Sequence, residues 1–335
     1  MTNLEILVRA NYGSGEISVD CREAVLAYLN RFPRSESRKL DFVKGLTNVG
    51  HSLFEQDYQS FSSSALAALI DLHEEGIAAA EVLLKEEGRV ERKAVSADAF
   101  GRHTYLLSSS AHLKGHLADI LMTMDFHNLF SDVNTWQQNI QKAYSLAYSA
   151  GRQFWQSDVT FSFHQLNIAA KAAYRLYEET GNIDFAEKSY HAMAGRCVVT
   201  DHDAESRKSS LNLEALQRKA FVAQSVFRNI RKNRDIPKDQ LLLWGGRAYH
   251  STRDRLLEGE LLPIDRANYH YDLAAVMSTL AGVASSPHLA QRAVWYYEDF
   301  LDYVSKNNLA SDVPHLVNAA QRGLQYILSD YYDSE

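Results

Sequence analysis

The sequence contains few turn-forming residues and little cysteine. It has 16 glycines and 5 prolines among 335 residues, together about 6% where an average protein has roughly 12%. Because few turn formers mean few turns per residue, this composition favours helices. Two cysteines, Cys21 and Cys197, cannot build a disulfide framework or, on their own, a multi-cysteine zinc site. We therefore expect a cytoplasmic, reducing setting.

Long apolar runs and a strong net charge are also missing. The longest purely apolar run covers residues 65–70, far short of the ~20 residues that a membrane span needs. Glu5 and Arg9 interrupt the apolar stretch at the start, so no signal peptide is predicted. The net charge of −7 and a pI near 6.0 argue against a wholesale nucleic-acid binder, although they leave a local basic patch open.

Helical periodicity is the dominant pattern along the chain. No series of segments with the period of two expected for strands occurs. In the clearest case, apolar residues recur at spacings of three and four and line one helix face: Leu213, Leu216, Ala220, Ala223, Phe227 and Ile230. The pattern predicts helices at about 20–31, 38–56, 61–87, 97–128, 135–155, 160–179, 183–198, 209–234, 237–258, 265–284, 287–306 and 312–331.

Helix ends carry their own signals. Candidate N-caps begin the segments Asp20–Glu23 and Thr135–Gln138, and Ser286 precedes Pro287. Three further prolines lie near predicted helix starts: Pro237, Pro263 and Pro314. Pro33 follows a predicted helix instead. Gly88, Gly181 and Gly259 are predicted terminators, and Gly76 marks a candidate break in the helix 61–87.

These elements predict an all-α protein of antiparallel helical hairpins. Short linkers between helices are typical of hairpins stacked as an α-solenoid, a curved array or a closed helical array. We predict an N-terminal helical region at 1–130 and repeat hairpins at 131–335, or one continuous array. The polar stretch 200–210 is either a boundary or a long connection.

Two segments resemble the tetratricopeptide repeat. In residues 162–198, Tyr177 takes the aromatic position of the first helix, Gly181 the turn, and Ala186 and Tyr190 the small and aromatic positions of the second. Residues 266–306 carry a similar pattern. The resemblance implies a helical-repeat module that binds peptides or protein partners in a concave groove. Plain helical hairpins with aromatic cores are the alternative interpretation.

One histidine-rich segment suggests a metal site. His112, His116 and Asp119 are spaced by four and three residues, which places them on one helix face. Two imidazoles and a carboxylate are zinc or iron ligands. Leu113 stands where a zinc metalloprotease would carry its glutamate. Solvated or hydrogen-bonded histidines are the alternative interpretation, and otherwise we expect no cofactor.

A basic strip covers residues 207–255. Its first part, 207–234, holds eight basic residues and one acid. Such a helix binds phosphates or an acidic protein partner, or is a solvated face balanced by acids of a neighbouring hairpin. The residues that we predict to contact a partner are Arg218, Arg228, Arg231, Trp244, Arg247, Tyr249 and Arg253. Tyr269, Tyr271, Tyr296 and Tyr297 are further candidates for lining a groove or packing between helices.

The sequence carries no nucleophile elbow, P-loop, dinucleotide fingerprint or Cys-x-x-Cys motif. The leading hypothesis is therefore a non-catalytic, protein- or peptide-binding helical-repeat module, for which an acidic partner is one of the alternatives that the basic strip leaves open. A nucleic-acid-binding regulator that uses the basic strip is a second hypothesis. A metal-binding helical enzyme that uses His112, His116 and Asp119 is a third.

Overall fold

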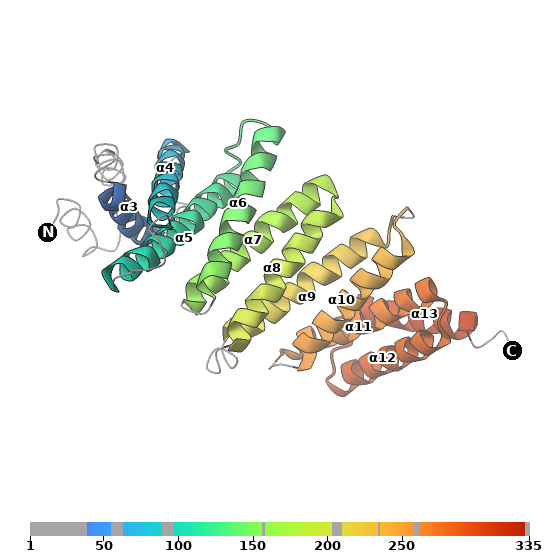
Figure 1. Ribbon diagram of the computed structural model, residues 1–335. Helices are drawn as coiled ribbons and strands as arrows, with labels where there is room; N and C mark the ends of the chain where they lie inside the picture. The colour runs from blue at the N-terminus through green and yellow to red at the C-terminus, as the bar shows by residue number, and fades with distance from the viewer. Residues whose placement is uncertain are drawn as a thin grey trace. The chain divides into compact units, whose positions relative to one another are not determined.

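The computed structural model describes residues 39–54, 63–88, 97–155, 158–202, 210–233, 235–257 and 261–331. Within these residues the chain forms eleven α-helices and no β-strand, as predicted (Figure 1). The helices are α3 (Lys39–Phe54), α4 (Ser63–Gly88), α5 (Ala97–Phe126), α6 (Val133–Phe154), α7 (Val159–Thr180), α8 (Ile183–His202), α9 (Ser210–Ile230), α10 (Lys238–Leu257), α11 (Pro263–Ala284), α12 (Pro287–Lys306) and α13 (Pro314–Tyr331). The predicted helix 20–31, its cap at Asp20, Pro33 and Gly259 lie outside the described residues.

Prolines and one glycine set the helix ends as predicted. Pro263, Pro287 and Pro314 are the first residues of α11, α12 and α13, and Pro237 directly precedes α10. The missing N–H of proline costs nothing there, because the first turn of a helix has no acceptor for it. Gly181 ends α7 with φ of +68°, a conformation that glycine adopts without strain. Its N–H donates to the Tyr177 carbonyl at 2.8 Å, which makes the tight turn into α8.

The start of α6 differs from the prediction. The N-cap is Asp132 and not Thr135, because the Asp132 carboxylate accepts the Thr135 N–H at 2.9 Å and its hydroxyl at 2.7 Å. An aspartate three residues upstream satisfies the free N–H groups of the first turn more strongly than a threonine inside the helix. The sequence pattern therefore predicted a capped start for this helix but placed the cap at Thr135, three residues too late.

Two further boundaries differ. No break occurs at Gly76, since α4 is continuous from Ser63 to Gly88. Instead, the missing side chain makes room for a neighbour: a Cβ built on Gly76 would lie 2.5 Å from Leu46 Cδ2. Helix α8 continues to His202, so it extends past the predicted end at 198 and into the polar stretch.

The contacts divide the chain into two units, residues 1–199 and 200–335. This division falls at the start of the polar stretch 200–210. The boundary predicted at 130/131 stays a prediction. Helices α5 and α6, on either side of it, pack against each other within the first unit.

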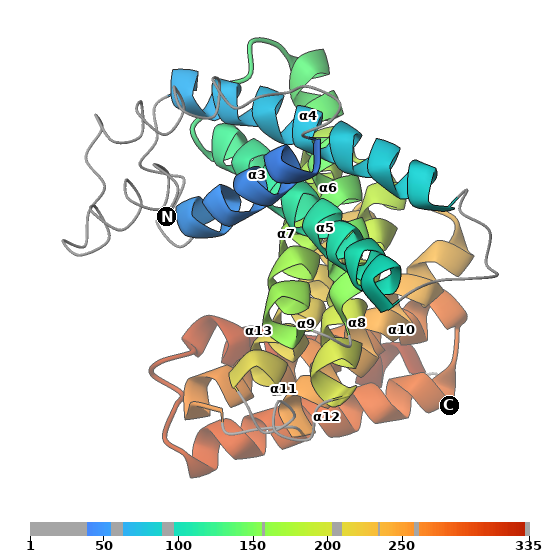
Figure 2. The same cartoon turned by 60° about the vertical axis from the view of Figure 1, so that its left-hand side comes forward.

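In the first unit each helix packs mainly on its neighbours in sequence (Figure 2). α3 contacts α4 and α5, α5 contacts α6, and α6 contacts α7. The Ser189 hydroxyl joins α8 to α7 by donating to the Ala170 carbonyl at 2.9 Å. Leucines dominate the buried core of the N-terminal helices: Leu46, Leu66, Leu69, Leu72, Leu106 and Leu113. Their burial on facing helix stripes is what the 3.6-residue period predicts.

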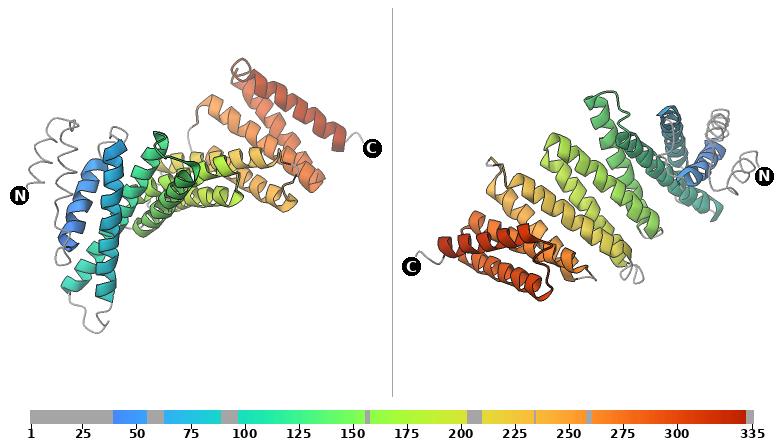
Figure 3. Two further views of the ribbon diagram at one scale, coloured as in Figure 1. Left: turned by 90° about the horizontal axis from the view of Figure 1, so that it is seen from above. Right: turned by 180° about the vertical axis from the view of Figure 1, so that it is seen from behind.

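In the second unit the same succession runs from α9 to α13 (Figure 3). The last helix contacts both α12 and α11, and the Tyr331 hydroxyl donates to the Ala281 carbonyl at 2.9 Å. The predicted stripe of α9 is largely confirmed, because Leu216, Ala220, Ala223, Phe227 and Ile230 are buried, whereas Leu213 at its start is partly buried. Its burial against α10 turns the opposite, charged face of α9 outward.

The two segments with repeat-like patterns coincide with helical hairpins, α7–α8 and α11–α12. The small and aromatic motif positions Ala186 and Tyr177 are buried. No helix in the described parts of the chain is both long and apolar enough to cross a membrane.

Candidate functional site

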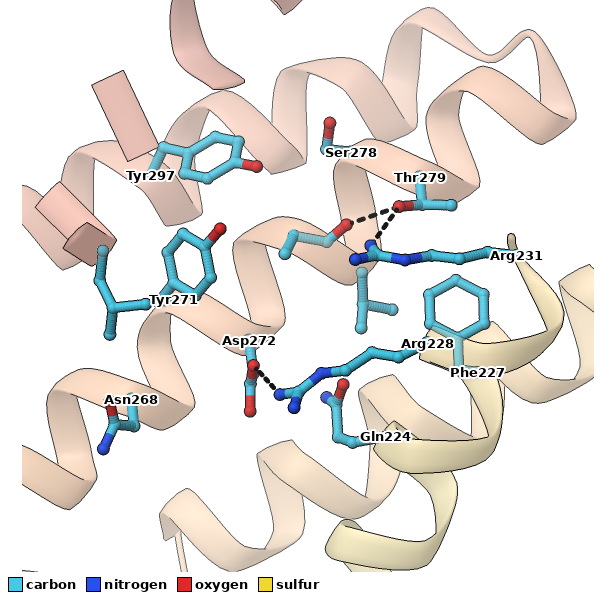
Figure 4. Close-up of a pocket in the computed structure, with 13 residues that line it drawn as sticks. Gln224, Phe227, Arg228, Arg231, Asn268, Tyr271, Asp272, Ser278, Thr279 and Tyr297 are labelled. Carbon is cyan, nitrogen blue, oxygen red and sulfur yellow. Dashed lines mark hydrogen bonds and ion pairs between the residues drawn. The ribbon is translucent and has the colours of Figure 1, made fainter. Parts of the chain in front are cut away.

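A cavity in the second unit lies where α9 faces α11. It measures about 590 Å³ and is walled by α9, α11, α12 and α13 (Figure 4). We call it the α9–α11 cavity. Its lining residues are Gln224, Phe227, Arg228, Arg231, Asn268, Tyr271, Asp272, Ala275, Val276, Ser278, Thr279, Tyr297 and Leu316. Two of the residues predicted to contact a partner, Arg228 and Arg231, are among them.

The position of these arginines follows from the periodicity of α9. Phe227 belongs to the buried stripe, whereas Arg228 and Arg231 are exposed at its edge. Their three-residue spacing puts both guanidinium groups on one side of the helix. They therefore form one wall of the α9–α11 cavity, and the side chains of α11 and α12 form the facing wall (Figure 4).

Each arginine has a partner on α11. Arg228 Nη2 donates to Asp272 Oδ1 at 2.6 Å, a short charge-assisted bond. Arg231 Nη1 donates to the Thr279 hydroxyl at 3.4 Å, a much weaker contact. Burial raises the pKa of the Asp272 carboxyl, and the nearby Arg228 acts in the opposite direction. The two walls together thus carry two guanidinium groups and one carboxyl group.

The facing wall supplies tyrosine hydroxyls. Tyr271 lies on α11 and Tyr297 on α12, with ring centroids 6.4 Å apart, and both rings face the arginines (Figure 4). Burial raises the pKa of Tyr297 to about 12. Tyrosine is protonated near neutral pH, and this shift keeps the Tyr297 hydroxyl a hydrogen-bond donor at higher pH as well. The cavity is thus bounded by cations on one side and by aromatic rings with donor hydroxyls on the other.

The other predicted partner residues lie apart from this cavity. The Trp244 side chain is 0% exposed, and the Arg247 guanidinium lies 4.6 Å from its ring centroid. Tyr249 is also buried, and its hydroxyl lies 2.8 Å from that of Tyr296. The Arg253 guanidinium lies 5.9 Å from the Tyr249 ring. These four residues form two aromatic–arginine pairs on α10, in which the aromatic rings are buried and any contact with a partner falls to the arginines.

Acids of neighbouring helices balance part of the basic strip. Lys219 pairs with Asp254 of α10 at 3.6 Å, and Arg253 approaches the same carboxylate at 3.8 Å. Arg228 pairs with Asp272 of α11. Arg218 is exposed on α9. This pattern matches the alternative in which the basic face is balanced by a neighbouring hairpin, and it reduces the charge available for tracking phosphates.

The histidine segment adopts internal contacts on α5. His112 Nδ1 donates to the Ser108 carbonyl at 2.9 Å, and its ring packs against Phe154 and Phe161. His116 is fully buried, whereas the Asp119 carboxylate lies 3.0 Å from His164 Nε2. Nowhere in the described parts of the chain do three histidine, cysteine or acidic side chains converge to hold a metal ion. The predicted zinc or iron site thus gains no support from the geometry.

Sequence reasoning missed the acidic and amide residues of the cavity, Asp272 and Asn268, and the hydroxyl of Thr279. The signal was present on α11. Polar residues and alanine recur at 268, 272, 275 and 279 with spacings of four, three and four, which marks a second helix face opposite the buried one.

A smaller cavity of about 350 Å³ lies in the first unit, between α5, α6 and α7. Its charged groups bind one another. Asp125 accepts the Trp136 indole N–H at 2.5 Å and pairs with Arg175 at 3.5 Å, and Arg175 pairs with Glu179 at 2.9 Å. The α9–α11 cavity, where Arg231 has only a weak contact with a hydroxyl, is therefore the stronger candidate.

Comparison with known proteins assigns no family to this chain. No family model matches it, and neither does any curated protein. Similar solved structures include a de novo designed helical repeat protein, DHR64, with 15% identity, a TM-score of 0.24 and coverage of 83% of this chain and 100% of that one. A circular tandem repeat protein has 14% identity, a TM-score of 0.36 and coverage of 97% and 84%. BtubC (BKLC) from P. vanneervenii has 14% identity, a TM-score of 0.28 and coverage of 82% and 92%. All three TM-scores lie below 0.5, so these likenesses assign neither a fold family nor a role to this chain.

Proposed function

We propose that this protein is a non-catalytic, protein- or peptide-binding module built from tetratricopeptide-like helical hairpins, and that the α9–α11 cavity is its binding site. One observation carries the proposal: two arginines from α9 face two tyrosines from α11 and α12 across a cavity of about 590 Å³. Tyrosine and arginine are the side chains that most often dominate binding energy at protein interfaces. A cytoplasmic location, favoured by the low cysteine content, is part of the proposal.

The proposal rests on recognition by side chains and involves no chemical step. Arg231 and the hydroxyls of Tyr271 and Tyr297 offer donors to a bound segment, while the two tyrosine rings offer apolar contact area. The basic strip is partly balanced by Asp254 and Asp272. We therefore favour a peptide over a nucleic acid, whose binding depends on many unbalanced cations.

Selection from a phage-displayed dodecapeptide library on the immobilised full chain tests the proposal. Enriched peptides are synthesised with fluorescein and titrated by fluorescence anisotropy. Arg231→Gln is expected to weaken binding about tenfold or more, because it removes a charged donor from the cavity. Arg322→Gln is the matched control, since Arg322 is exposed on α13 and does not line the cavity.

Two outcomes contradict the proposal: a selection that enriches no sequence, and enriched peptides that bind both variants as tightly as the wild type. A fluorescein-labelled single-stranded oligonucleotide is titrated in parallel. If it binds more tightly than any peptide, with affinity that falls steeply as salt rises, the nucleic-acid hypothesis replaces the present one.

A further inference from the structure

The Arg228–Asp272 pair is unequal in exposure. The Arg228 side chain is 50% exposed, whereas that of Asp272 is 18% exposed and lies inside the α9–α11 cavity. A guanidinium has five N–H donors. One of them, on Nη2, donates to Asp272 Oδ1. The geometry therefore already shows how a carboxylate sits against this arginine.

We propose that Asp272 is a built-in competitor: it engages Arg228 in the free protein, and the ligand is a peptide segment whose aspartate or glutamate side chain takes its place between Arg228 and Arg231. This inference rests on the proposed function and adds to it the chemistry of the ligand and a limit on its affinity. The incoming carboxylate gains two guanidinium groups, and the negative charge of Asp272 opposes its entry.

The charge balance of the cavity favours a carboxylate over other groups. With Asp272 in its charged form, two guanidinium groups and one carboxylate leave a single positive charge, which one carboxylate of the ligand neutralises. A dianionic phosphate would leave a net negative charge in the cavity, and a lysine side chain is repelled by both arginines. Tyr297 lines the same cavity, and its hydroxyl can donate to the second carboxylate oxygen.

A purely structural role for the Arg228–Asp272 pair predicts a change in ligand affinity opposite to the one expected of a competitor. If the Arg228–Asp272 bond only joins α9 to α11, removing the carboxylate loosens the cavity and weakens every ligand. If Asp272 competes with the ligand, removing its charge strengthens binding of acidic peptides. The direction of the change in affinity therefore separates the two roles.

The test uses the selected peptides and the full chain. Each peptide that carries an aspartate or glutamate is compared with its asparagine or glutamine counterpart on wild type, Asp272→Asn and Asp302→Asn. Asp302 is the matched control, because it is exposed on α12 and pairs with Lys306 outside the cavity. Circular dichroism and thermal melting verify the fold. Should Asp272→Asn not fold, Asp272→Ser removes the same charge with a smaller side chain.

We expect the amide peptides to bind wild type at least about tenfold more weakly than the acidic ones. We expect Asp272→Asn to bind the acidic peptides about fivefold more tightly or better, with no gain for the amide peptides and no change in Asp302→Asn. Weaker or unchanged binding of acidic peptides by the Asp272 variant overturns the inference. So does a selection that enriches neutral or basic peptides.

The two proposals fail in distinguishable ways. If neutral peptides bind wild type and bind Arg231→Gln more weakly, the proposed binding function stands and only the competitor role of Asp272 is refuted. A selection that enriches nothing removes both.

Discussion

Acidification is expected to destabilise the first unit through His73. This side chain lies on α4, is 0% exposed, and its Nδ1 donates to the Leu69 carbonyl at 2.7 Å. Burial lowers the pKa of His73 from 6.5 to about 4, because the charged form loses its hydration, and the backbone bond only partly offsets this. The His116 ring, 6.2 Å away, adds an aromatic neighbour and no counter-charge.

The direction of this pH effect on stability follows from the difference in proton binding between the unfolded and the folded chain. Between pH 6.5 and pH 4 the unfolded chain binds a proton at His73 and the folded chain does not, so the folded state loses stability as the pH falls. These pKa values give a loss of about 2 kcal/mol between pH 7 and pH 5, and about 3 kcal/mol by pH 4. The effect fades as the pH rises above 6.5, because His73 of the unfolded chain then also becomes neutral.

Hydrogen–deuterium exchange of residues 63–88, corrected for the intrinsic pH dependence of exchange, measures this local stability. The protected amides of α4 should exchange about twentyfold faster at pH 5 than at pH 7 relative to that intrinsic rate. His73→Phe keeps a ring of similar size and does not titrate, so it should lose most of this pH dependence. His191→Gln is the control, because His191 is exposed on α8. Equal pH dependence in wild type and His73→Phe refutes the reasoning.

Three substitutions test the packing and the caps, each by its effect on the free energy of unfolding. Trp244→Ala removes the largest fully buried side chain among the described residues and should cost about 3–5 kcal/mol, measured by urea unfolding. Ser162→Ala removes a buried hydroxyl that donates to the Gly151 carbonyl at 2.6 Å, and should cost about 1 kcal/mol in the same assay. Asp132→Ala removes the N-cap of α6 and should cost about 1 kcal/mol, seen as a lower melting temperature. Thr135→Ala should cost less, because it leaves the Asp132 cap and its bond to the backbone N–H in place. A larger loss in Thr135→Ala than in Asp132→Ala contradicts the assignment of the cap.

The fold was largely predictable from the sequence because its signals are local. Periodicity, four prolines and Gly181 each act within one or two turns of the chain, and they place α9 to α13 within a few residues of their observed bounds. The errors are also local. The N-cap of α6 is Asp132 and not the predicted Thr135. At Gly76 the helix continues, and the glycine instead lets Leu46 pack closely.

The site was only half predictable because it depends on contacts between distant helices. Arg228 and Arg231 stood out through the charge pattern of α9, and Tyr271 and Tyr297 through their aromatic character. That Arg228 meets Asp272, 44 residues further along the chain, follows only from the packing of α9 on the α10–α11 pair. The same packing places Trp244 in the interior, where its residue type alone had suggested a contact surface.

The succession of helices in each unit also has a kinetic consequence. The main packing contacts join helices that are adjacent or one apart in sequence. Chains with such short-range contacts close small loops during folding and therefore fold rapidly. They also tend to open from an end, one hairpin at a time, because each hairpin is stabilised mainly by its nearest neighbours. Fraying of α13 should accordingly expose the α9–α11 cavity, which it helps to wall through Leu316, before α9 and α10 separate.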